Sequence, residues 1–242
     1  MINDSNSPSK LNIDIFLDGA DLEIVKKFSD YDFIKGFTSN PSLMHKSKIT
    51  SYEKFIEEFL KITSKPISFE VVSDDIFEMK EQAIKLNSYG PNVYVKIPVT
   101  NSKGIETTQI ISELSDLNIK LNVTAIFTIK QIQTLIDNVA PKEDIILSIF
   151  AGRIADTGRD PTEIFLDSKK LLENKSKKFK LLWASVREVY NIYEASKVGS
   201  DIITVTPDIF SKINLMNKDL TQYSLETVKM FYDDAQKGNI IV

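Results

Sequence analysis

The chain has 242 residues, of which 42% are hydrophobic and 26% charged, as in globular proteins and unlike disordered, collagenous or coiled-coil chains. It has no Cys and a single His, His45, which excludes disulfide scaffolds, thiol nucleophiles and Cys- or His-rich metal sites and disfavours a Ser-His-Asp triad. A formal net charge of -4 argues against general nucleic-acid binding, although a local basic pocket can still bind phosphate.

The start of the chain is polar and lacks the apolar segment of a secretion signal. We therefore expect residues 1–10 to form a short flexible lead-in. No run approaches the roughly 18 apolar residues of a membrane span, so we expect no membrane insertion and a cytoplasmic location.

Short β-rich runs alternate with segments of helical periodicity along the whole chain. The predicted strands are residues 11–19, 32–40, 66–72, 92–99, 120–127, 144–152, 180–187 and 201–207. The predicted helices are residues 51–63, 75–89, 102–117, 128–139, 160–173, 188–198 and 224–236.

A strand followed by a helix, repeated about eight times, requires parallel strands and right-handed crossovers. We predict an α/β fold, a (β/α)8 TIM barrel with an extra C-terminal helix, forming a single domain over residues 11–242. A doubly wound open sheet is the alternative, but it favours a glycine-rich phosphate loop after the first strand, and none is present.

Alternation within the fourth predicted strand separates an apolar face from a polar one. Val93, Val95 and Ile97 share one parity and should face the helices. Lys96 has the other parity, which in a closed barrel points to the interior.

The same test places polar or functional side chains inside the barrel on other strands, mostly near their C-terminal ends. These residues are Asp18, Thr38, Asn40, Ser68, Glu70, Asn122, Thr124, Ser148, Phe150, Trp183, Ser185 and Arg187. Active sites of such barrels lie at that end, so we expect a site there.

A lysine inside a barrel has no solvent face, so its ammonium group must either give up its proton more readily or pair with a carboxylate. An uncharged lysine in a pocket is a nucleophile toward carbonyl carbons. Lys96 is therefore a candidate for forming a Schiff base with a ketone, which borohydride trapping would test.

Seven motifs in order resemble those of the transaldolase family, across most of the chain. They are Phe16-Leu17-Asp18-Gly19-Ala20-Asp21-Leu22, Thr38-Ser39-Asn40-Pro41-Ser42, Ile67-Ser68-Phe69-Glu70-Val71-Val72-Ser73, Val95-Lys96-Ile97-Pro98, Asn122-Val123-Thr124, Ser148-Ile149-Phe150-Ala151-Gly152-Arg153-Ile154 and Ala184-Ser185-Val186-Arg187. The length resembles the compact branch, which includes small transaldolases and fructose-6-phosphate aldolases.

The resemblance implies four catalytic residues. Lys96 matches the Schiff-base lysine, and Asp18 matches the acid/base that takes the C4 hydroxyl proton and drives C3–C4 cleavage. Glu70 and Thr124 match the pair that orients a catalytic water and relays protons. An iminium at Lys96 accepts the electrons of cleavage, so no metal and no cofactor is expected.

The resemblance also implies a substrate-binding set. Asn40 and Asn122, with Thr38 of the same motif, match ligands of the dihydroxyacetone hydroxyls, and Ser148 matches a contact of the bound three-carbon unit. At the other end of the substrate, Arg187 and Ser185 match the phosphate site, with Arg153 as a second cation.

Two positions separate transferase from aldolase by resemblance. Glu70 and Phe150 are the transaldolase choices, whereas fructose-6-phosphate aldolases typically have Gln and Tyr there. Phe cannot donate a proton to the carbon intermediate, so that intermediate should survive until an aldehyde acceptor arrives. We therefore expect a transaldolase that takes dihydroxyacetone from fructose 6-phosphate or sedoheptulose 7-phosphate, in the pentose phosphate pathway.

Three alternatives remain open at this point: a fructose-6-phosphate aldolase-like lyase, an enzyme for a modified sugar, and a non-catalytic barrel that binds sugar phosphates. Residues 154–161 lie where members of the family differ from one another, so the resemblance does not determine whether the end group of the substrate is a phosphate. Trp183 either packs in the core or narrows the acceptor site.

We expect sugar phosphates as ligands, no nucleic-acid or membrane partner, and a homo-oligomer. Leu225, Val228, Met230 and Phe231 on the last helix suit exchange between copies, as in compact family members, but also suit packing within one chain.

Overall fold

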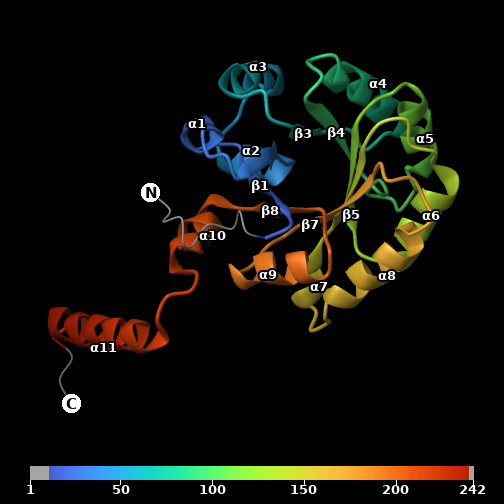
Figure 1. Ribbon diagram of the computed structural model, residues 1–242. Helices are drawn as coiled ribbons and strands as arrows, with labels where there is room; N and C mark the ends of the chain where they lie inside the picture. The colour runs from blue at the N-terminus through green and yellow to red at the C-terminus, as the bar shows by residue number, and fades with distance from the viewer. Residues whose placement is uncertain (1–10, 240–242) are drawn as a thin grey trace.

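The computed structural model describes residues 11–239 and forms a closed barrel of eight parallel strands in sequence order, with β1 paired to β8 (Figure 1). The strands are β1 (Asp14–Asp18), β2 (Ile34–Thr38), β3 (Ile67–Glu70), β4 (Val93–Pro98), β5 (Leu121–Ile126), β6 (Ile145–Ile149), β7 (Phe179–Trp183) and β8 (Ile202–Val205). The predicted (β/α)8 barrel is confirmed. The lead-in predicted for residues 1–10 lies outside the described residues.

Helices surround the barrel in Figure 1, with short extra helices in several loops. The α-helices are α1 (Leu22–Ser29), α2 (Pro41–Lys46), α3 (Tyr52–Ile62), α4 (Ile76–Asn87), α5 (Thr108–Asp116), α6 (Ile129–Asn138), α7 (Ala151–Ala155), α8 (Thr162–Leu172), α9 (Tyr190–Lys197), α10 (Pro207–Ser211) and α11 (Leu220–Lys237). In the part of the chain from 11 to 239, no helix is both long and apolar enough to cross a membrane.

Side-chain capping explains why several helices begin where they do. Asp75 accepts hydrogen bonds from two backbone N–H groups in the first turn of α4, and Thr128 forms a reciprocal capping box with Gln131 in α6. These local signals agree with the apolar periodicity, so α4 and α6 begin within one residue of the predicted positions.

Apolar side chains form two separate layers, one between strands and helices and one inside the barrel. The outer layer takes the residues of one parity, including Val95 and Ile97. The inner layer is smaller and contains Phe16, Ile146 and Leu182. Alternation along each strand therefore separates the core from the site.

Other helices begin further from their predicted positions: α8 and α9 start two residues later and α11 four residues earlier, and the largest difference is at α5. The periodicity predicts a helix from residue 102, but α5 starts at Thr108. Asn101 accepts hydrogen bonds from Lys103 N–H and Ile105 N–H, and Thr100 forms an antiparallel bridge with Glu106. This turn satisfies backbone groups that a longer helix would have used.

The structure corrects the predicted interior position of Trp183. Its ring stacks on Phe165 of α8, with centroids 4.7 Å apart, so it is core packing outside the barrel. Leu182 and Ala184 face the interior instead. The prediction ran one alternation through residues 180–187, but β7 ends at Trp183 and Ser185 has φ 65°, which breaks the strand geometry.

The last helix stands away from the barrel in Figure 1. None of the 18 residues of α11, all of them described, is buried. The alternative that its apolar side chains pack within the chain is therefore wrong.

Candidate active site

A cavity of about 170 Å³ opens at the C-terminal ends of the strands. Its lining includes Asp18, Thr38, Asn40, Lys96, Asn122, Thr124, Ser148, Phe150, Arg153, Ser185, Arg187, Thr204 and Thr206. Eleven of the twelve site residues expected from the sequence are in this set, and Glu70, the twelfth, lies beside Lys96. The cavity is smaller than the roughly 300–1,000 Å³ of a drug-sized ligand site, so it suits a small unit with the rest of the ligand at the rim.

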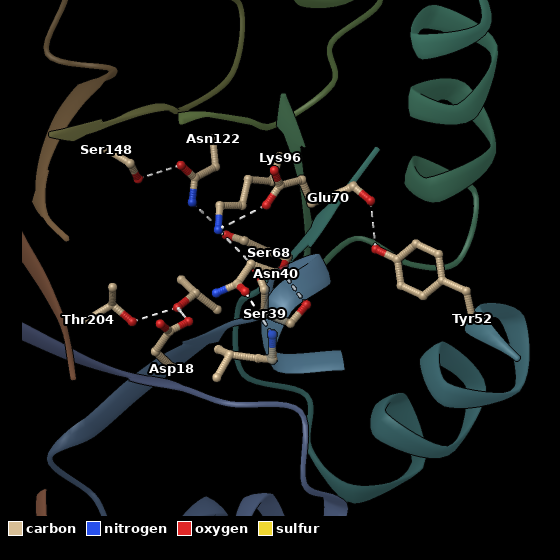
Figure 2. A network of polar contacts seen from close by, with 12 residues as sticks. Asp18, Ser39, Asn40, Tyr52, Ser68, Glu70, Lys96, Asn122, Ser148 and Thr204 are labelled. Atoms are coloured by element: carbon tan, nitrogen blue, oxygen red, sulfur yellow. Dashed lines mark hydrogen bonds and ion pairs between the residues drawn. The ribbon is translucent and has the colours of Figure 1, made fainter. Parts of the chain in front are cut away.

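Lys96 is held at the centre of the polar network in Figure 2. It is only 6% exposed, and its Nζ lies 3.0 Å from the carbonyl oxygen of Ser39 and 3.3 Å from Oε2 of Glu70. Glu70 and Asn122 are its register partners on the neighbouring strands. The carboxylate expected beside a buried lysine is therefore present, and the amine is shielded from bulk water.

Asp18 ends β1 on the same side of the barrel. Its Oδ1 accepts a hydrogen bond of 2.7 Å from Thr38 Oγ1, which lies 2.6 Å from Thr204 Oγ1. Burial raises the pKa of Asp18 above its usual range, although the positive charge of Lys96 and the bond from Thr38 act in the opposite direction. Such a carboxyl group is placed to take a proton from a bound ligand and to return it.

A second short network fixes Asn122. Its Nδ2 donates to Ser68 Oγ at 2.9 Å, and its Oδ1 accepts from Ser148 Oγ at 2.6 Å (Figure 2). All three residues are buried and come from β3, β5 and β6. The amide is thereby locked in one orientation toward the cavity.

Thr124 and Asn40 also have polar atoms that are available to a ligand. Thr124 Oγ1 is buried and has no hydrogen-bond partner within residues 11–239, so it is available to a ligand or a water in the cavity. Asn40 accepts from Leu43 N–H at 2.9 Å as the N-cap of α2, which leaves its amide nitrogen as the ligand donor.

Two arginine side chains, Arg153 and Arg187, line the rim of the cavity. The guanidinium carbon of Arg153 lies 5.7 Å from the centre of the Phe150 ring, and Nη2 of Arg187 is 2.5 Å from Oδ2 of Asp156. Ser185 lines the cavity between these groups and the strands. An anionic end group would meet two guanidinium groups here.

Tyr52 of α3 holds the backbone of Glu70 by a hydrogen bond. Its hydroxyl donates to the backbone carbonyl of Glu70 at 2.9 Å, and burial together with the negative charge of Glu70 raises the pKa of the phenol (Figure 2). Tyr52 lies in the helix predicted for residues 51–63, and nothing in its sequence spacing indicates this bond.

Thr204 and Thr206 are the other residues that the sequence reasoning missed. They alternate with Ile203 and Val205, which belong to the outer core. The parity test that found Lys96 would have found both threonines if applied to residues 201–207.

Comparison with known proteins agrees with this geometry. The family model described as Transaldolase/Fructose-6-phosphate aldolase matches residues 15–239. A probable transaldolase of Nitrosopumilus maritimus is 37% identical over 93% of this chain and 97% of its own length. Probable transaldolases of Thermoplasma volcanium and Listeria monocytogenes are 36% and 33% identical over 84% and 87% of this chain and 87% and 92% of theirs. The chain belongs to the transaldolase/fructose-6-phosphate aldolase family.

Proposed function

We propose that this protein is a transaldolase that moves a dihydroxyacetone unit from a ketose phosphate to an aldose phosphate through a Schiff base on Lys96. The main support for this proposal is a buried lysine amine inside a closed barrel, which lies beside a carboxylate and faces a small polar cavity. The family and the names of the relatives support the same activity.

In the proposed reaction, the unprotonated Nζ of Lys96 attacks the C2 carbonyl carbon of the ketose and water leaves, which forms an iminium. Asp18 takes the proton of the C4 hydroxyl, the C3–C4 bond breaks, and its electrons move into the iminium to form an enamine. The aldehyde fragment departs. The enamine carbon then attacks the carbonyl of the acceptor, whose oxygen takes the proton back from Asp18, and water releases the product from Lys96.

The remaining residues bind and orient. Asn122 and Ser148 are placed to hold the hydroxyls of the three-carbon unit, and Glu70 with Thr124 are placed to position the water that enters and leaves. Arg153 and Arg187 at the rim favour a phosphorylated end group. The donors we propose are fructose 6-phosphate and sedoheptulose 7-phosphate.

The test is an assay with fructose 6-phosphate, with and without erythrose 4-phosphate. A transaldolase should consume fructose 6-phosphate only when the acceptor is present and form a seven-carbon ketose phosphate. Release of free dihydroxyacetone without an acceptor would indicate an aldolase instead. If neither occurs, the proposed substrates are wrong.

Phe150→Tyr should shift the protein toward the aldolase outcome. Phe150 lines the cavity and carries no donor, so a Tyr hydroxyl there introduces an acid that can protonate the enamine. We expect acceptor-independent release of dihydroxyacetone to rise by about tenfold or more. The measurement is the ratio of free dihydroxyacetone to transfer product. Phe127→Tyr is the control, because the Phe127 ring contacts that of Phe150 but is not part of the cavity lining. Equal ratios in wild type and Phe150→Tyr would contradict the role given to Phe150.

A homo-oligomer is part of the same proposal. The helix α11 is about 27 Å long for its 18 residues and exposes Leu225, Val228 and Phe231 by 48%, 60% and 63%. Apolar faces of this size are normally covered, and a second copy of the chain is the partner we propose.

The double substitution Leu225→Lys with Phe231→Lys should therefore reduce the molar mass in solution to that of a smaller assembly or a monomer. Asp233→Lys adds the same two positive charges on the polar face of α11 and should leave the assembly intact. Light scattering after gel filtration measures the mass. An unchanged mass in the double variant would contradict the role of α11.

A cytoplasmic location, a metal-independent reaction and a single domain over residues 11–242 remain predictions. They agree with the composition of the chain, and the geometry of the site does not depend on them.

A further inference from the structure

The cation assigned to the phosphate end group already has an acidic partner. Nη2 of Arg187 lies 2.5 Å from Oδ2 of Asp156, the C-cap residue that follows α7. The side chains of Arg187 and Asp156 are 51% and 54% exposed, so both can rearrange when a ligand arrives. The pair stands at the rim of the cavity, where the substrate's far end would lie.

The backbone brings these two side chains together. A Cβ at Gly152 would lie 1.6 Å from the carbonyl oxygen of Ser185, so only glycine lets α7 lie directly against the segment that leads to Arg187. Asp156 N–H donates to Gly152 O at 2.9 Å and so lies one helical turn further on. The short aspartate side chain reaches Arg187 because of this close contact.

The pair changes the charge that an end group meets. Arg153 and Arg187 carry two positive charges and Asp156 one negative charge, so these three side chains together present a net charge of about +1 rather than +2 to a phosphate. A phosphate ester carries nearly two negative charges at neutral pH. Binding it to Arg187 brings it close to the carboxylate or displaces the carboxylate from Nη2.

We propose that Asp156 determines end-group specificity: it competes with the substrate phosphate for Arg187, and thereby weakens phosphate binding and narrows the advantage of phosphorylated over neutral substrates. This inference rests on the proposed function only for the assignment of Arg187 to the end group. The exposed pair is weak enough to open on binding, so the effect is moderate.

The experiment compares Asp156→Asn with wild type in calorimetric titrations with inorganic phosphate at fixed ionic strength. The dissociation constant for phosphate should fall by about two- to fivefold, because the competing charge is lost while the shape is kept. The ratio of kcat/KM for fructose 6-phosphate to that for fructose should rise by a similar factor.

Two further variants make the result specific. Asp160→Asn removes the same charge from the same loop and keeps an acceptor for Thr162, so it should leave phosphate binding unchanged. In an Arg187→Gln background, Asp156→Asn should have no effect, because the competition requires Arg187.

Equal, weaker or undetectable phosphate binding by Asp156→Asn would overturn the inference, as would an equal gain in Asp160→Asn. Failure of the proposed function would give a different result. If Lys96 formed no Schiff base, borohydride with fructose 6-phosphate would leave no adduct on the wild-type protein, while the phosphate titrations would still report on Asp156.

Discussion

Lys96→Met should abolish turnover while leaving the barrel folded. The substitution removes the amine that forms the iminium in the proposed reaction, and Met fills a similar volume among buried neighbours. We expect kcat to fall by on the order of 10⁴- to 10⁶-fold, as when a covalent nucleophile is removed from other enzymes. The measurements are transfer of dihydroxyacetone and mass spectrometry after borohydride reduction with fructose 6-phosphate.

Wild type should gain the mass of a reduced adduct at Lys96, and Lys96→Met should gain none. Lys120→Met is a matched control, because Lys120 is the same residue type but directly precedes β5, at the opposite end of the barrel from the cavity, and donates to the backbone carbonyl of Pro91. Circular dichroism checks that the fold is kept. Retained turnover in Lys96→Met, or an adduct on another lysine, would refute the mechanism, and lost turnover with unchanged phosphate binding would exclude a pure binding protein.

Asp18→Asn should lower kcat by about 10²- to 10⁴-fold, the usual contribution of a positioned acid/base. Asn can still accept the hydrogen bond from Thr38 Oγ1, so the side chain keeps its position but cannot take a proton. Formation of the adduct at Lys96 should continue, since that step precedes C3–C4 cleavage. The measurements are kcat and the yield of borohydride adduct in the same variant.

The same substitution should stabilise the protein at neutral pH. Because burial raises the pKa of Asp18, the folded state binds the proton more tightly than the unfolded state, in which the pKa is about 3.9. The free energy of unfolding therefore falls as the pH rises from the pKa of Asp18 in the unfolded state through its pKa in the folded state. An Asn at this position does not titrate, so the variant does not lose this free energy.

Thermal unfolding should show this gain as a melting temperature raised by a few degrees at pH 7, at about 2–4 °C per kcal/mol, and no gain near pH 3. In wild type, the acid limb of kcat/KM should lie above the ordinary range of an aspartate for the same reason. A melting temperature that falls at pH 7 would show that the attraction of Lys96 outweighs the burial of Asp18.

The fold could be predicted because it depends on patterns that are local in sequence. Parity along residues 92–99 separates Val95 from Lys96, and in a closed barrel that alternation alone decides which side chain faces the core and which the cavity. Helix starts such as Asp75 are equally local, because the capping bond joins residues two or three apart. Alternation fails where the backbone departs from regular strand geometry, as at Ser185, and this is why Trp183 was placed on the wrong side.

The sequence by itself determined the barrel, the family resemblance and eleven residues around one cavity, since periodicity and motif order carry that information. Only the tertiary structure decided which groups touch: the pairing of Arg187 with Asp156, the chain from Thr204 through Thr38 to Asp18, and the bond from Tyr52 to Glu70. Those contacts join residues 18 to 166 positions apart, and their partners are chosen by strand register and by the close approach at Gly152, which no local pattern encodes.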